Sequence, residues 1–119
     1  DLLTLTKVRR FETKLGERLQ ILQSSNDLEQ ALQASAARFV IFGIPEDIGV
    51  KANYGIGGAD TAWFPFLNSF LNIQSNDFLG GDEILLLGHF DFADAESLIE
   101  NNAHSFEEKV DAYRHAVNM

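Results

Sequence analysis

The segment Phe39-Val40-Ile41-Phe42-Gly43-Ile44, closed by Pro45, decides the fold class of this 119-residue chain. It is a continuous apolar run rich in β-branched and aromatic residues. That pattern is typical of a strand buried on both faces of a parallel sheet. The run Glu83-Ile84-Leu85-Leu86-Leu87-Gly88 repeats it further along the chain. We therefore predict two buried strands, at about residues 38–44 and 83–88.

The residues between these strands predict a crossover helix at about 60–73. Asp60 is placed to cap it, and its apolar face would hold Trp63, Leu67, Phe70 and Leu71. A helical crossover makes the two strands parallel, so the fold class is α/β. Residues 45–58 carry four glycines and a proline without a hydrophobic period, which predicts a long loop. Loops at the carboxyl ends of parallel strands commonly bind ligands.

A closing helix is predicted at about 105–118. Ser105 and Glu108 form a capping box, and Phe106, Val110, Tyr113 and Val117 recur at helical spacing. At the other end, residues 1–37 form an N-terminal arm with a short helix from about Asp27 to Ala37, whose N-cap would come from Ser24-Ser25-Asn26-Asp27. Residues 1–23 fit a helix or an extended arm equally well.

The charge and composition of the chain exclude several classes of function. Eighteen acidic against nine basic side chains give a net charge of -9, which repels nucleic acid and anionic membranes. The absence of cysteine excludes disulfides and thiolate zinc sites and fits a cytoplasmic protein. The longest apolar runs are far shorter than the ~20 residues of a membrane-spanning helix.

Two stretches together resemble a known enzyme family. They are Phe39-Val-Ile-Phe-Gly43-Ile-Pro45-Glu-Asp47-Ile-Gly49-Val and Asn53-Tyr-Gly55-Ile-Gly57-Gly58-Ala59-Asp60. They are similar to the opening strand and glycine-rich loop of the arginase, agmatinase and formimidoylglutamase (ureohydrolase) family, closest to the formimidoylglutamase-like branch. The resemblance covers residues 38–119. It implies that they form the N-terminal portion of a partial three-layer, arginase-like α/β domain.

The resemblance also implies an activity for a larger parent protein. Family members are metal-dependent hydrolases, usually with two manganese ions, that cleave C–N bonds of small guanidino or formimino substrates. Their ligands lie in Gly-Gly-x-His, Asp-x-His-x-Asp and Ser-x-Asp-x-Asp blocks, none of which occurs here. We therefore expect Mn²⁺ in the parent and no cofactor, metal ligand or catalytic residue in this N-terminal fragment, which would be inactive alone. By the same resemblance, Asp47, Asn53, Tyr54 and Gly55 are the substrate-loop candidates.

Two polar patterns have a sharper and a plainer interpretation. Gly80-Gly81-Asp82 imitates the first metal block, but Glu83 stands where histidine is needed, so an ordinary turn is favoured. His89, Asp91 and Asp94 follow the second strand and would form a weak metal constellation. Their plainer roles are loop hydrogen bonding and helix capping.

A different class of function also fits the sequence. The chain would then be a stand-alone acidic α/β interaction or assembly module without catalysis. Its apolar helix face would bind a partner. Truncation of a parallel sheet leaves strand edges unpaired and the apolar face of the closing helix partly covered, so we expect the isolated chain to self-associate or form a homo-oligomer. A monomer would favour the interaction module.

Overall fold

The computed structural model describes residues 2–22 and 27–118. Its elements are, in order, η1 (Leu2–Thr4), α1 (Leu15–Arg18), β1 (Gln20–Ile21), α2 (Leu28–Ala34), β2 (Phe39–Gly43), α3 (Ile48–Ala52), η2 (Ala59–Ala62), α4 (Trp63–Phe70), β3 (Ile84–His89), α5 (Ala93–Asn102) and α6 (Phe106–Val117). The fold is mixed α/β, as predicted. The chain forms two compact units, residues 1–43 with 64–88 and residues 44–63 with 89–119.

The first unit is built on a three-stranded parallel sheet in the order β1-β3-β2. Strand β1 pairs with β3 in parallel, with Gln20 opposite Leu85 and Ile21 opposite Leu86. The N-terminal residues therefore supply a third strand that no sequence pattern predicted. A strand of two residues is too short to show a period of two. The sequence allowed residues 1–23 to form either a helix or an extended arm. Both occur in part, because the short helix α1 lies just before strand β1.

Strand β3 confirms the prediction for residues 83–88, because it lies between its two neighbours and its side chains are buried. Ile84, Leu85 and Leu86 are at most 4% exposed. Leu15 of α1, Leu67 of α4 and Leu71 just after α4 complete the fully buried side chains of this unit.

Strand β2 forms where predicted, but the expectation that it is buried on both faces is wrong. Phe39, Val40, Phe42 and Ile44 are 44–58% exposed. The physical reason is position, since β2 lies at the edge of the sheet. An apolar run predicts that a strand favours burial. How far the strand is buried depends on how many elements pack against it.

The crossover helix is shorter than the predicted range 60–73. Residues 59–62 form the 3₁₀ turn η2, and Asp60 lies inside that turn, so its predicted capping role is wrong. Pro65 falls in the first turn of α4, where the missing N–H has no helical partner to lose. In α2 the Asp27 carboxylate accepts from Gln30 N at 3.0 Å and caps the helix. The other proposed capping residues, 24–26, lie outside the described part of the chain.

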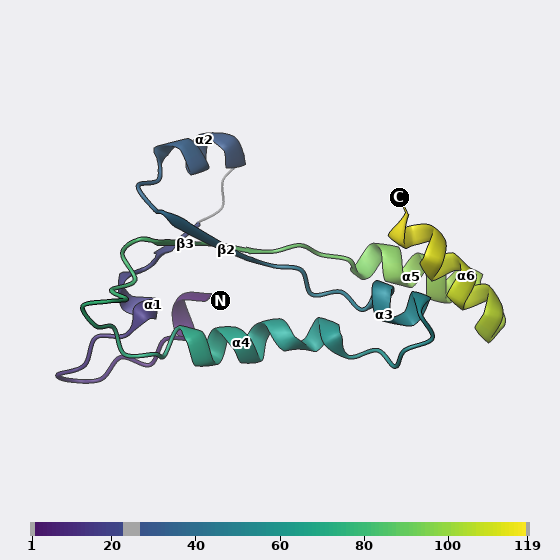
Figure 1. Cartoon of the computed structure of the whole chain (residues 1–119), viewed down its shortest axis with the longest axis horizontal. Helices are drawn as coiled ribbons and strands as arrows, with labels where there is room; N and C mark the ends of the chain where they lie inside the picture. Colours follow the sequence, from purple (N-terminus) through teal and green to yellow (C-terminus); the bar gives the residue numbers. More distant parts are fainter. Residues whose placement is uncertain (1, 23–26, 119) are drawn as a thin grey trace. The chain divides into compact units, whose positions relative to one another are not determined.

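The second unit packs α3, α5 and α6 side by side (Figure 1). Its core contains Ile48, Ala52, Ile99 and Tyr113. Helix α6 confirms the closing helix together with its Ser105–Glu108 capping box. The predicted apolar face is only half correct: Val110 and Tyr113 are buried, whereas Phe106 and Val117 are 66% and 56% exposed.

Two helices of this unit were not predicted. Helix α3 interrupts the expected loop 45–58, and α5 follows the second strand, where no helix was assigned. Both lack a long apolar stripe, because α3 has five residues and α5 buries only Ile99. No helix among residues 2–22 and 27–118 has the length and apolar character needed to cross a membrane.

Candidate functional site

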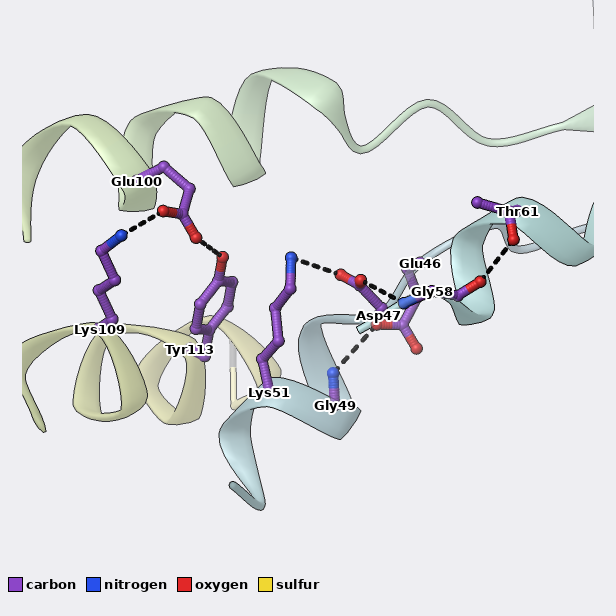
Figure 2. A network of polar contacts seen from close by, with 9 residues as sticks. All are labelled: Glu46, Asp47, Gly49, Lys51, Gly58, Thr61, Glu100, Lys109 and Tyr113. Atoms are coloured by element: carbon purple, nitrogen blue, oxygen red, sulfur yellow. Dashed lines mark hydrogen bonds and ion pairs between the residues drawn. The ribbon is translucent and has the colours of Figure 1, made fainter. Parts of the chain in front are cut away.

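The candidate site is the polar network that holds the segment after β2. Asp47 begins it, with a side chain that is almost completely buried. One carboxylate oxygen, Oδ1, lies 2.9 Å from Lys51 Nζ, and the other, Oδ2, accepts a hydrogen bond from Gly58 N at 3.0 Å (Figure 2). A single carboxylate therefore ties the start of α3 to a backbone amide eleven residues further along.

Helix α3 is fixed locally by its own polar residues. Glu46 Oε2 accepts a hydrogen bond from Gly49 N at 3.1 Å, which satisfies one amide of the first turn. At the other end, Asn53 Nδ2 donates to Gly49 O at 3.1 Å. These bonds explain why a glycine-bearing segment forms a helix of five residues instead of the expected loop.

Asp47 also forms a carboxyl pair with Glu96 of α5. Burial raises the pKa of Glu96, and the hydrogen bond to Asp47 raises it further. Burial would raise the pKa of Asp47 as well, but hydrogen bonds from Lys51, from the Gly58 amide and from Glu96 outweigh that effect and lower it. The two shifts have opposite directions, so Asp47 loses its proton at a lower pH than Glu96 does.

The network continues on α6 through Tyr113. Lys51 Nζ lies 5.2 Å from the centroid of the Tyr113 ring, and the Tyr113 hydroxyl donates to Glu100 (Figure 2). Glu100 also pairs with Lys109. The hydrogen bond to Asp47 raises the pKa of Lys51. Hydrogen bonds from Lys109 and Tyr113 lower the pKa of Glu100. The pKa of Tyr113 is raised, mainly by burial and next by its hydrogen bond to Glu100.

A cavity of about 190 Å³ lies beside this chain of groups. Its lining comes from the glycine-rich segment, α5 and α6, and consists of Lys51, Gly55, Gly57, Glu100, Phe106, Lys109, Val110 and Tyr113. Two ammonium groups, a carboxylate and a phenol therefore face a small space. This arrangement can bind a polar small molecule.

The four substrate-loop candidates take different positions. Asp47 is 4% exposed, and its carboxylate contacts Lys51 and Gly58 N at the base of the loop. Gly55 lines the cavity, and its N donates to Val50 O at 2.8 Å. Asn53 and Tyr54 are exposed at the end of α3. The Tyr54 ring lies 6.1 Å from the Phe106 ring, with Arg114 5.0 Å above its face.

The polar residues at the end of β3 and just after it make local contacts with the backbone. Asp91 Oδ1 accepts from Ala93 N at 2.9 Å at the start of α5, and His89 Nδ1 lies 2.8 Å from Phe90 O. Residues 80–82 form part of a turn, with Gly81 at φ 98°. Within residues 2–22 and 27–118, no group of three His, Cys, Asp or Glu side chains is arranged to hold a metal ion.

Several members of the network were not singled out from the sequence. The spacing of Asp47 and Lys51, four residues apart, is a helical ion-pair signal that required recognising α3. Glu96 and Glu100 have the same spacing on α5, which was also missed. Tyr113 was predicted only as part of an apolar face, although a buried tyrosine hydroxyl needs a hydrogen-bond partner.

Comparisons of the chain with protein-family models, curated proteins and solved structures give no match. The resemblance to the ureohydrolase family is therefore carried by the sequence motifs alone.

The carboxyl pair predicts how stability depends on pH. The pKa of Asp47 is lowered, so its contribution is present above its ordinary value of 3.8 and is lost as the pH falls. The pKa of Glu96 is raised, so its contribution is complete below its ordinary value of 4.5 and is lost as the pH rises through the raised value. We expect Glu96→Gln to remove the loss of unfolding free energy between mildly acidic and neutral pH, because the amide still donates to Asp47.

The measurement is urea denaturation across that pH range. Glu108→Gln is the control. Hydrogen bonds from the backbone amides of His104 and Ser105 lower the pKa of Glu108. Its replacement should therefore change the pH dependence of the unfolding free energy only at acidic pH. An unchanged slope in Glu96→Gln would show that the pKa of Glu96 is not raised.

Gly58 predicts a second effect, because it adopts φ 129°. Open space surrounds the position where its Cβ would lie, so any cost of Gly58→Ala comes from the backbone alone. We expect a loss of about 1–2 kcal/mol in unfolding free energy. Gly49→Ala is the matched control, since it lies in α3 and its added Cβ would meet only Glu46 Oε1 at 3.8 Å. Equal denaturation midpoints for the two variants would contradict the assignment.

Proposed function

We propose that this chain is the N-terminal part of an arginase-like, metal-dependent hydrolase that cleaves a C–N bond in a small guanidino or formimino compound. In this proposal residues 38–119 are part of a three-layer α/β domain. The segment 45–58 forms part of the substrate rim, with Asn53, Tyr54 and Gly55 as its contact residues. The motifs quoted above, from Phe39 to Asp60, support the family.

The observation that carries the proposal is a loop with a fixed base and an exposed tip. Asp47 is 4% exposed and binds both Lys51 and Gly58 N. Between those two anchors, residues 53–57 are all exposed, and Ile56 is 96% exposed. Polar bonds thus hold the segment in one conformation while its tip presents tyrosine, isoleucine and glycine to solvent. Substrate-contacting loops combine these properties, because a positioned loop loses little entropy on binding.

The described residues do not fit the manganese centre of such an enzyme. The donors nearest to β3, His89 and Asp91, are engaged with local backbone groups, and no ligand set of three converges within residues 2–22 and 27–118. We therefore assign no metal ligand and no catalytic residue to this chain. Its own residues shape the rim, and Asp47 acts on that rim as a positioning residue.

The proposal is tested on the complete protein that contains this chain. With Mn²⁺ present, we expect it to release ammonia, urea or formamide from guanidino or formimino compounds. Tyr54→Ala should raise KM by about tenfold with a smaller change in kcat, as expected for loss of a contact worth about 1.4 kcal/mol in binding.

Phe78→Ala is the control, because Phe78 is a fully exposed aromatic residue of the other unit. Absence of hydrolysis for every guanidino and formimino compound, in a folded and manganese-loaded protein, would overturn the proposal. An active enzyme in which Tyr54→Ala behaves like Phe78→Ala would remove Tyr54 from the rim.

A second function, an acidic interaction or assembly module, is favoured by the exposure of β2. This edge strand presents Phe39, Val40 and Phe42 to solvent on both of its faces. Exposed apolar edges pair with other strands. Association between copies would cover the strand without any catalysis.

This second function predicts self-association of the 119-residue chain. Sedimentation at increasing concentration should show a rising average mass, and Val40→Lys with Phe42→Lys should reverse it, because charges on an edge strand oppose pairing. Phe78→Lys is the matched control at an equally apolar, fully exposed position outside the sheet. A monomer at all concentrations would show that β2 does not pair between copies of the chain.

A further inference from the structure

The basic residues of this acidic chain are concentrated near its N-terminus. Residues 1–18 contain five basic side chains and three acidic ones, a net charge of 5 - 3 = +2. The whole chain has a charge of -9, so residues 19–119 carry -9 - 2 = -11. A positive segment in such a chain is a local feature of the charge distribution, and its placement in the fold decides what it can attract.

Three of these cations meet in one polar pocket of the first unit, with a volume of about 520 Å³. The pocket lies between the N-terminal arm and the end of α4, and it is lined by Lys7, Arg9, Glu12, Lys14, Asn68, Asn72 and Gln74. Three basic groups and one carboxylate leave a net charge of 3 - 1 = +2 on its walls. Three carboxamides supply the remaining polar lining.

Hydrogen bonds hold the two walls of this pocket together. Asn72 Oδ1 accepts from Lys7 N at 2.9 Å, and Asn72 Nδ2 donates to Leu5 O at 3.0 Å. Lys14 and Gln74 form an antiparallel bridge, and Ser75 N donates to Thr13 O at 2.8 Å. The cations are therefore presented by backbone that is bonded to the opposite wall.

Lys14 is the most informative member of the pocket. The residue is 7% exposed, and its Nζ donates to Asn72 Oδ1 at 3.2 Å. No carboxylate among the described residues forms an ion pair with Lys14, Lys7 or Arg9. By contrast, the basic residues Arg38, Lys51, Lys109 and Arg114 each lie within 4.0 Å of a carboxylate. A lysine with so little exposed surface and no carboxylate partner offers its positive charge to a bound anion.

We propose that the Lys7–Arg9–Lys14 pocket binds a phosphate group, as inorganic phosphate or as a small phosphate monoester. Near neutral pH a phosphate monoester carries close to two negative charges on one tetrahedral group, which matches the net charge of the walls. Arginine binds phosphate oxygens in pairs, lysine supplies a point charge, and the carboxamides of Asn68 and Gln74 can donate further hydrogen bonds. Asn72 instead uses its amide hydrogens on Leu5 O and Asn68 O. This site lies in the unit that holds the sheet and does not depend on the proposed hydrolase activity.

Titration calorimetry of the chain with inorganic phosphate and with glycerol phosphate, a small phosphate monoester, tests the site and distinguishes the two ligands. We expect binding at low salt that weakens as salt screens the exposed cations. Lys7→Gln and Arg9→Gln should each weaken binding by about threefold to tenfold, whereas Glu12→Gln should strengthen it by a similar factor. Arg38→Gln is the matched control, because it removes the same charge from an exposed ion pair with Glu83 outside the pocket.

Lys7, Arg9 and Glu12 are all exposed, so these variants keep the buried Lys14 and the hydrogen bonds around it. Succinate, which carries two charges on separate carboxylates, should bind more weakly than phosphate. Equal affinity for succinate, or equal weakening by Arg38→Gln, would overturn the proposal. So would the absence of heat with both phosphate ligands. If Lys7→Gln instead changed only the sedimentation behaviour, the cations would be a contact between copies of the chain.

Discussion

The arrangement of the second unit depends on one buried carboxylate, that of Asp47. A charged group with so little exposure is stable only when its oxygens are satisfied. Lys51 and the amide of Gly58 satisfy them, and a hydrogen bond with Glu96 helps to lower the pKa of Asp47. These partners come from α3, from the end of the glycine-rich segment and from α5. The contacts of one carboxylate therefore hold three segments of the chain together.

Two glycines of that segment, Gly57 and Gly58, lie against the same carboxylate. A Cβ on Gly57 would overlap Asp47 Oδ2 and would lie 2.9 Å from Lys51 Cε. Gly58 provides the amide that Asp47 binds while adopting φ 129°. The exposed tip between α3 and Gly58 is thus a consequence of packing at its base. A rim of this kind is positioned before any ligand arrives, which is the physical basis of the proposed role in substrate contact.

The first unit follows a different rule, in which apolar burial dominates. Strand β3 buries Ile84, Leu85 and Leu86, and Leu15, Leu67 and Leu71 of the same unit are completely buried. Strand β2 has the same apolar character but lies at the sheet edge and remains half-exposed. The contrast between two similar sequences shows that burial is decided by neighbours. It also leaves β2 as the surface on which further strands or copies would pack.

The sequence by itself determined the α/β class, both longer strands, the crossover helix and α6 with its cap, because each of these rests on a local pattern of apolar period or capping chemistry. It also placed Asp47 among the residues of interest. Only the tertiary structure decided that Gln20–Ile21 joins the sheet and that Asp47 meets Glu96. The same holds for Lys7, Arg9 and Lys14, which share one pocket with Asn72. These pairings join residues up to 65 positions apart, as for Lys7 and Asn72, and no periodic signal within a window of one turn or strand extends over that distance.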